Sequence, residues 1–379
     1  MDARNFVAPN WGRAVSTGGR DPYVSFAPVD LPRHLVLEPA TVTALSNADS
    51  NLGRLAGVSR ILPQPHLLLL PYLTMEAVAS SRIEGTQASV SDVFEARATG
   101  GRTSADVREV SNYIRALDHG IERLATLPLS TRLIREMHKI LLTGVRGQEQ
   151  TPGELRVSQN WIGTAKPASA LFVPPTVDQM KPALSAWEYY IHDDKPELPL
   201  LIRTALLHYQ FETIHPFLDG NGRLGRLFVV LYLMEREAIP APLLPLSAAL
   251  ERRREEYYER LQAVRERGEI QEWLRFFLNI ISDTAVDSII RAERLVDLRE
   301  RYRSSLAGSR SRAAEVVDLI MGSPVITTRQ VTDALGVSLV SAGNLLRQLE
   351  GHRILESEVR GQGTATIWRA LEILAAVND

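Results

Sequence analysis

Cysteine is absent from this chain of 379 residues. Disulfides, thiolate zinc sites and thiol nucleophiles are therefore excluded, and nothing points to an oxidising compartment. Long hydrophobic runs are missing too, since the closest candidates, residues 67–73 and 227–234, fall short of the roughly 20 residues that span a bilayer. No charged segment followed by an apolar one opens the chain. We therefore expect a soluble, cytoplasmic protein.

An excess of either charge is also lacking. The 43 Lys and Arg residues nearly balance 45 Asp and Glu residues, which gives a formal net charge of −2 at pH 7. This balance provides no overall attraction to nucleic acid or acidic membranes, so any such role needs a local patch. The hydrophobic content of 45% and the chain length predict a globular protein with a sizeable core and two or three domains.

Residues 215–226, His-Pro-Phe-Leu-Asp-Gly-Asn-Gly-Arg-Leu-Gly-Arg, separate two apolar segments with helical spacing. Gly220 and Gly222 leave room for backbone N–H groups to close on an anion just before a helix N-terminus. Arg223 and Arg226 share one face of the first turn of that helix. Two cations there oppose the helix dipole, and a bound polyphosphate would reverse that penalty.

Asp219 and His215 add reactive groups to this anion site. One carboxylate with phosphate oxygens and water is a usual way to hold Mg²⁺, and a histidine accepts protons near neutral pH. Each feature alone is usually structural, but together within twelve residues they indicate attack of a hydroxyl on a metal-bound phosphate. Residues 220–225 also match the dinucleotide pattern G-x-G-x-x-G, which we reject because a helix rather than a strand precedes it.

At every position, residues 215–226 resemble the signature of Fic-domain proteins, His-x-Phe-x-(Asp/Glu)-Gly-Asn-Gly-Arg-x-x-Arg. The resemblance implies a helical fold and transfer of AMP from ATP to a Ser, Thr or Tyr hydroxyl of a target protein, the chain itself included. It implies His215 as the general base, Phe217 as a buried anchor of the nucleotide site and Asp219 as the Mg²⁺ ligand. It also implies phosphate binding by Gly220, Asn221, Gly222, Arg223 and Arg226.

Ser80 and Glu84 lie one helical turn apart at the end of a predicted helix that Gly85 terminates. Alone, this pattern is that of a solvated helix end. However, Ser80-x-x-x-Glu84-Gly85 resembles the inhibitory motif (Ser/Thr)-x-x-x-Glu-(Gly/Asn) that many Fic proteins carry N-terminal to the core. The resemblance implies that Glu84 pairs with Arg226 and blocks productive placement of ATP.

Residues 160–163 and 170–173 are short β-prone segments around glycine and proline, and we expect a hairpin there. In Fic proteins a hairpin at this place, called the flap, pairs with the modified segment of the target as an added strand. The resemblance therefore implies that the target protein binds along residues 160–175. A plain surface hairpin is the alternative.

Residues 251–260 alternate arginines with acids, which favours an exposed, salt-bridged helix over a basic patch. Fic proteins often have Asn near the position of Arg253, where it contributes to the nucleotide pocket, and Tyr near the position of Ala249. Arg253 is therefore a candidate nucleotide-binding residue, and the two departures leave the contacts to adenine and ribose open.

The chain divides into an N-terminal arm and inhibitory-helix region (1–100), a Fic catalytic core (101–305) and a C-terminal domain (306–379). A Ser/Gly/Arg-rich linker marks the second boundary. Two predicted helices flank the signature. Apolar spacing also predicts a helix that begins at residue 39 and helices over residues 105–125, 130–142, 177–191, 273–281 and 286–302.

The C-terminal domain has the outline of a winged helix-turn-helix, with three predicted helices and a strand pair around residues 361–363. Its candidate recognition helix exposes Ser341, Asn344 and Arg347. Residues 310–379 hold seven Arg or Lys against eight Asp or Glu, a poor balance for DNA. Protein contact or support of a homodimer is therefore favoured over DNA binding.

The sequence thus predicts a mainly α fold, a Fic helical bundle with a short β-hairpin flap and a C-terminal winged helix. The leading functional hypothesis is an autoinhibited protein adenylyltransferase that uses ATP and Mg²⁺, with attack on the α-phosphate and departure of pyrophosphate. One alternative keeps the site but uses another donor or removes AMP. Another is a DNA-binding regulator whose Fic body senses nucleotide.

Overall fold

The computed structural model describes residues 1–18, 22–61, 66–100, 103–163, 166–308, 311–359 and 366–378. These residues form mainly helices, as the predicted fold class requires, together with small antiparallel sheets near the two ends of the chain. Within these ranges, no helix is both long and apolar enough to cross a membrane.

Helices α7 (Leu200–Ile214) and α8 (Asn221–Glu235) form the centre of the structure. Every residue of α7 from Leu201 to Ile214 is buried, as expected for a helix that is apolar on most of its faces. Such a helix needs neighbours on all sides. The core around this pair is completed by α2 (His66–Ile83), α4 (Ala105–Leu124), α5 (Thr131–Leu141), α6 (Val177–Ile191), α9 (Leu246–Arg252) and α10 (Arg254–Arg267).

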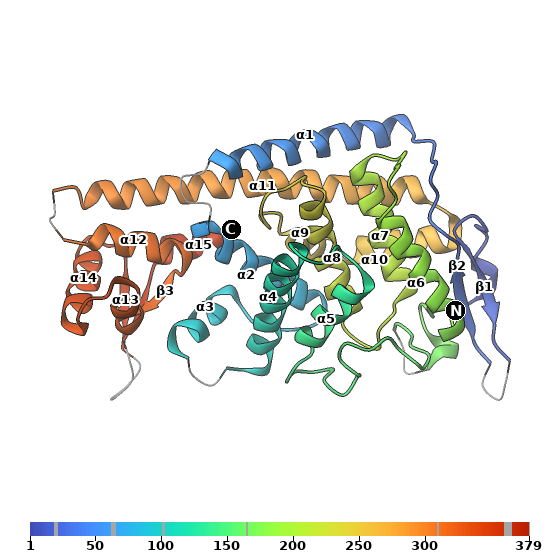
Figure 1. Cartoon of the computed structure of the whole chain (residues 1–379), viewed down its shortest axis with the longest axis horizontal. Helices are drawn as coiled ribbons and strands as arrows, with labels where there is room; N and C mark the ends of the chain where they lie inside the picture. Colours follow the sequence, from blue (N-terminus) through green and yellow to red (C-terminus); the bar gives the residue numbers. More distant parts are fainter. Residues whose placement is uncertain are drawn as a thin grey trace.

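Helix α11 (Ile270–Ser305) has 36 residues, and α1 (Pro39–Ile61) packs along it on one side of the core (Figure 1). The sequence predicts two helices over this part of the chain. They are one helix because no glycine or proline interrupts residues 270–305. Helix α11 therefore runs beside both the central bundle and the C-terminal elements (Figure 1).

The N-terminal arm contains strands that the sequence does not predict. Strand β1 (Gly12–Ser16) pairs antiparallel with β2 (Val24–Pro28), and a short 3₁₀ helix, η1 (Ala3–Asn5), precedes them. Two aromatic side chains of the arm are buried, Trp11 against Tyr209 of α7 and Phe26 against Phe172. The arm thus lies on the core, in part as a hairpin.

Two further details differ from the predictions. Helix α3 (Val90–Thr99) follows α2 and begins with a capping box between Ser89 and Asp92, a signal that the sequence analysis did not use. The charged segment 251–260, predicted as one helix, is divided between α9 and α10. The division falls at Arg253, which has non-helical backbone angles.

The C-terminal region contains α12 (Ala313–Gly322), β3 (Val325–Thr327), α13 (Thr328–Leu335), α14 (Leu339–Gly351), β4 (Glu356–Glu358), β5 (Ile367–Arg369) and α15 (Leu371–Asn378). The three strands form an antiparallel sheet in the order β3-β5-β4. Strands β4 and β5 are the strand pair expected around residues 361–363, and residues 360–365 between them lie outside the described residues. The winged-helix assignment itself stays a prediction. On α14, Ser341, Asn344 and Arg347 are exposed.

The C-terminal elements pack against the N-terminal helices (Figure 1). Helices α12 and α15 contact α2, and β3 contacts α3. Arg369 of β5 pairs with Glu95 of α3 at 2.6 Å, with both side chains mostly buried. Arg291 of α11 donates to backbone carbonyls of α15. These contacts join the C-terminal region to the helix that carries Ser80.

Candidate functional site

The signature residues form the connection between α7 and α8. His215 ends α7 in the left-handed region, with φ 51° and ψ 61°, a conformation that non-glycine residues rarely adopt. Pro216 cannot continue the helix, and Gly220 precedes α8 with φ 79°. The loop therefore turns sharply between α7 and α8.

Asn221 and Phe217 hold this loop in shape. The Asn221 side chain accepts a hydrogen bond from the Phe217 N–H and donates one to the Phe217 carbonyl, both at 2.9 Å. The Phe217 ring is fully buried and stacks on the ring of His138, with centroids 4.0 Å apart. The Asn221 amide is thus committed to the loop, and phosphate contacts from this residue would come from its backbone.

His138 of α5 is a loop-supporting residue that the sequence analysis missed. Its Nδ1 accepts a hydrogen bond from the Gly153 N–H at 2.7 Å, so its Nε2 carries the proton and donates to the Asp219 carbonyl at 3.0 Å. Burial lowers the pKa of His138 to about 4, which keeps the ring neutral. No local sequence pattern distinguishes His138, because its partners are distant in the chain.

His215 is arranged as a proton acceptor. Its Nδ1 lies 3.3 Å from the Glu212 carbonyl, which can only accept, so Nδ1 carries the proton and Nε2 keeps its lone pair. Burial, reinforced by the cations Arg265 and Arg156, lowers the pKa of His215 to about 4 although the hydrogen bond to Glu212 opposes this. The imidazole is therefore neutral at physiological pH.

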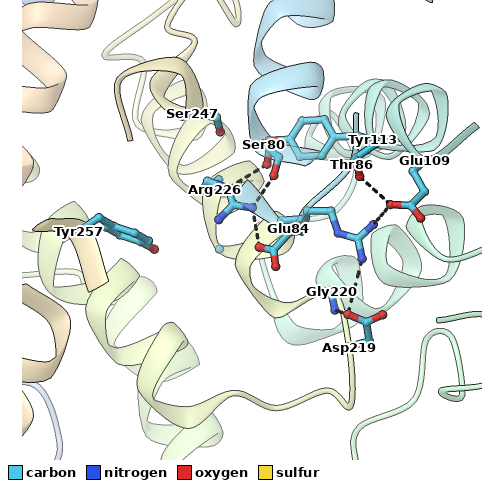
Figure 2. A network of polar contacts seen from close by, with 12 residues as sticks. Ser80, Glu84, Thr86, Glu109, Tyr113, Asp219, Gly220, Arg226, Ser247 and Tyr257 are labelled. Atoms are coloured by element: carbon cyan, nitrogen blue, oxygen red, sulfur yellow. Dashed lines mark hydrogen bonds and ion pairs between the residues drawn. The ribbon is translucent and has the colours of Figure 1, made fainter. Parts of the chain in front are cut away.

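Arg226 is held by the end of α2 (Figure 2). Its Nη2 donates to Glu84 Oε1 at 2.9 Å and to the Ser80 carbonyl at 3.0 Å, and its Nε donates to Ser80 Oγ at 2.8 Å. The Arg226 side chain is 1% exposed and that of Glu84 is 30% exposed. Burial alone would raise the pKa of Glu84, but the charge and hydrogen bond of Arg226 outweigh it and hold that pKa below its ordinary value.

Gly222 makes room for this ion pair. A Cβ atom at position 222 would lie 2.4 Å from Glu84 Oε1 and 3.0 Å from Arg226 Nη1. Any side chain at this position would collide with the carboxylate. The glycine of the signature therefore permits the close approach of Glu84 as well as the predicted approach of a phosphate.

Arg223 is a buried cation that lies near two carboxylates but makes no hydrogen bond with the described residues. Its side chain is 1% exposed and lies 3.6 Å from Glu109 Oε2 and 3.7 Å from Asp219 Oδ1. None of its three guanidinium nitrogens has a hydrogen-bond partner within the part of the chain that the structure describes. Buried donors without partners are costly and mark a place where an anion would be bound strongly.

Glu109 of α4, which the sequence analysis missed, links Arg223 to the end of the predicted inhibitory segment. Its carboxylate accepts a hydrogen bond from the Thr86 hydroxyl at 3.1 Å (Figure 2). Arg146 lies 3.7 Å from the same carboxylate and donates to the Glu84 carbonyl at 3.1 Å. The two signature arginines therefore each face an acid from a different helical region.

Asp219 is the acid nearest the start of α8. Its Oδ1 accepts a hydrogen bond from the Gly220 N–H at 2.7 Å, and its side chain is 37% exposed. Across the described ranges, no group of three or more His, Cys, Asp or Glu side chains is arranged to hold a metal ion. A single open carboxylate fits Mg²⁺ only when phosphate oxygens and water supply the other ligands.

Arg253 lies away from the signature contacts. It is at the junction of α9 and α10, half-exposed, and pairs with Asp283 of α11 at 2.9 Å. Its hydrogen bond goes to α11 rather than to residues 215–226. The structure therefore gives no contact that ties Arg253 to the site, and its nucleotide role stays a prediction.

Among the described residues, the predicted hairpin is reduced to one bridge. The Ile162 N–H donates to the Phe172 carbonyl at 2.8 Å and the Leu171 N–H to the Ile162 carbonyl at 3.0 Å, while residues 164–165 lie outside the described residues. Leu171 is 72% exposed. Next to this bridge, the Phe26 N–H of β2 donates to the Val173 carbonyl at 2.9 Å, so the N-terminal arm adds to the same structure.

Comparison with known proteins places about half of the chain in one family. Residues 42–122 match the model of the Fic/DOC family N-terminal region, and residues 128–233 match that of the Fic/DOC family. A solved Fic family protein from Desulfovibrio desulfuricans G20 aligns over 90% of this chain and 98% of its own, with a TM-score of 0.59 and 20% identity. That likeness shows the fold.

Curated relatives match over part of their length. Protein adenylyltransferase Fic of Drosophila grimshawi is 28% identical over 208 residues, which cover 53% of this chain and 40% of that protein. Protein adenylyltransferase fic-1 of Caenorhabditis elegans is 31% identical over 144 residues, which cover 38% of this chain and 25% of that protein. The chain thus spans less than half the length of these relatives. The two family matches, together with the complete signature at residues 215–226, show that residues 42–122 and 128–233 carry the N-terminal region and the main domain of the Fic/DOC family.

Proposed function

We propose that the chain is a protein adenylyltransferase, which transfers AMP from ATP to a hydroxyl side chain of a target protein. The observation that carries this proposal is that the signature presents both a neutral His215 with a free Nε2 lone pair and the buried guanidinium of Arg223. This guanidinium lies near Glu109 and Asp219 but makes no hydrogen bond among the described residues. A proton acceptor and an unsatisfied cation in one signature suit attack of a hydroxyl on a phosphate. The names of the curated relatives, both protein adenylyltransferases, support the same reaction.

In the proposed reaction the target hydroxyl oxygen bonds to the α-phosphorus while the bond from that phosphorus to the bridging oxygen breaks. His215 Nε2 takes the hydroxyl proton, and pyrophosphate leaves with the electron pair of the broken bond. Arg223 would stabilise the charge that develops on the phosphate oxygens, because a desolvated and already oriented guanidinium acts without reorganisation. The left-handed turn at His215 fixes the base in the loop that leads into α8, the helix that carries Arg223.

Asp219 would hold Mg²⁺ together with the nucleotide phosphates. The metal would supply positive charge to the phosphate oxygens and orient them. The contribution of the chain is the placement of the carboxylate, since the Gly220 N–H fixes Oδ1 while 37% of the Asp219 side chain stays exposed. The close approach of Gly147, where a Cβ would lie 2.4 Å from Oδ2, further restricts the carboxylate.

Autoinhibition is the second part of the proposal. Glu84 and Ser80 occupy three donor positions of Arg226, the cation expected to receive the terminal phosphate of ATP. A nucleotide must therefore displace a charge-assisted hydrogen bond before it can bind productively. The modified segment of the target would lie along residues 160–175, beside the exposed Leu171.

The test incubates the Glu84→Gly protein with ATP labelled at the α-phosphate and with a cell lysate. Covalent label on proteins, lost in the Glu84→Gly, His215→Ala double variant, is the expected result. A correctly folded Glu84→Gly protein that labels neither itself nor any lysate protein would contradict the proposal. Label from the γ-phosphate instead would indicate phosphate transfer.

A further inference from the structure

We propose that Arg156, assisted by Asn160, is the positioning residue that fixes the catalytic turn at His215 against the target-binding hairpin. The proposal rests on the proposed function, and it concerns a residue outside the signature. Arg156 lies in the segment that leads into residues 160–163, and its side chain is completely buried. Asn160 is 7% exposed.

The first observation is a row of hydrogen bonds to four consecutive carbonyls. Arg156 donates from Nη2 to Ile214 at 3.5 Å, from Nε to His215 at 3.0 Å and from its backbone N–H to Pro216 at 3.0 Å. Asn160 Nδ2 donates to the His215 carbonyl at 3.0 Å and to the Phe217 carbonyl at 2.7 Å. The end of α7 leaves these carbonyls without helical partners, and Arg156 and Asn160 supply the donors.

The second observation is that the same guanidinium reaches both legs of the hairpin. Its Nη1 donates to the Ser158 carbonyl at 3.3 Å, before the hairpin, and its Nη2 donates to the Pro175 carbonyl at 2.5 Å, after it. One planar group therefore joins the turn at His215 to both ends of residues 160–173. A target strand held by the hairpin is thereby placed relative to the base.

The third observation is electrostatic. Within the described ranges Arg156 faces no carboxylate, and burial lowers its pKa to about 10, which still leaves it charged at neutral pH. A buried cation without an acid partner is expensive, so carbonyl oxygens and the dipole at the end of α7 must stabilise it. This charge also acts on His215 and disfavours its protonation.

The charged groups around His215 come from several elements. Arg265 of α10 and Arg156 disfavour the protonated imidazole, whereas the Glu84 carboxylate and the Glu212 carbonyl favour it. Removal of the Arg156 charge should therefore raise the pKa of His215. Replacement of Arg156 by lysine should keep the positive charge but lose the planar guanidinium with its several donors. One ammonium group cannot reach the carbonyls of His215, Ser158 and Pro175 together.

These two effects define the experiment, which is performed in the Glu84→Gly background. We expect Arg156→Lys to lower kcat for transfer about tenfold to a hundredfold, as for a small displacement of a base, with unchanged affinity for ATP. We expect Arg156→Gln to lower kcat as well and also to move the acid limb of the pH profile to higher pH. Histidine NMR should show the same upward change in the His215 titration.

Arg135→Lys is the matched control. Arg135 is 41% exposed, donates to the Gly153 carbonyl at 2.8 Å and pairs with Glu154 at 2.5 Å, so it holds the same segment without touching the turn at His215. The Arg135→Lys substitution should leave kcat and the His215 titration unchanged. If Arg156 variants fail to fold, Asn160→Ala removes one donor from the His215 carbonyl while Asn221 still serves Phe217.

The outcomes are separable. Parent-like kcat in Arg156→Lys, or an unchanged His215 titration in Arg156→Gln, would overturn the proposal. If the Glu84→Gly protein transfers no AMP, the proposed function fails, but the titration of His215 still decides whether Arg156 acts on the base. A loss of melting temperature alone, with parent kcat at lower temperature, would make Arg156 a structural residue and also overturn the proposal.

Discussion

Replacement of Glu84 by glycine should activate the protein. The change removes the carboxylate that accepts a hydrogen bond from Arg226 Nη2 at 2.9 Å and leaves the guanidinium available for a phosphate. Glu84 lies just beyond the last residue of α2, Ile83, so glycine there avoids the usual cost inside a helix. Any gain in activity therefore reports on the ion pair rather than on a disrupted helix.

The size of the effect follows from the environment of the pair. A hydrogen bond between charged groups contributes about 1.5–3 kcal/mol when it is buried. Arg226 is almost fully buried, but Glu84 is 30% exposed, and solvent screening places the value in the lower part of that range. At about 1.4 kcal/mol per factor of ten, we expect the increase in transfer to lie toward the lower end of roughly tenfold to a hundredfold.

The assay compares initial rates of self-labelling and target labelling by α-labelled ATP. Glu84→Gln is the informative partner variant, because it keeps the shape and loses the charge, and it should activate to an intermediate degree. Arg226→Ala should lose activity and make Glu84→Gly nearly silent. Equal rates for the parent and Glu84→Gly proteins across several nucleotide donors would refute the autoinhibition and return Ser80 to Gly85 to an ordinary helix end.

His215→Ala should abolish transfer but leave ATP affinity within a few fold by calorimetry, because the base acts on the incoming hydroxyl; loss of both binding and folding would make His215 structural. Asp219→Ala should lose activity together with its dependence on added Mg²⁺, and unchanged turnover would place the metal elsewhere. Because a base works when unprotonated and the pKa of His215 is lowered to about 4, activity of Glu84→Gly should stay level as pH falls from 8 to 6; a decline centred near the ordinary histidine value would contradict this assignment.

The sequence predicts the centre of the fold well. Residues 177–191 form α6 with the predicted bounds, and the signature separates two buried helices as expected. These parts are predictable because apolar periodicity and helix breakers act locally. The approach of Glu84 to Arg226 follows from two short motifs that carry the family resemblance, although the two residues are far apart in the chain.

The supporting residues could not be predicted in the same way. His138 reaches Asp219, Glu109 reaches Arg223 and Arg156 reaches His215 over long sequence separations, so no local pattern marks them. The strands β1 and β2 were missed because residues 1–35 show no clear period. The hairpin shrinks to a single bridge between Ile162 and Phe172, since β-propensity indicates extended backbone but not how many residues pair.

We propose that this site transfers AMP, with His215 as the base and Glu84 as the inhibitory residue. Intact-mass measurement of the Glu84→Gly protein after incubation with Mg²⁺ and ATP is the decisive test of this proposal. We expect a protein carrying the added mass of AMP, absent from the Glu84→Gly, His215→Ala variant and much weaker in the parent. An added phosphate, or an AMP adduct that persists without His215, would contradict it.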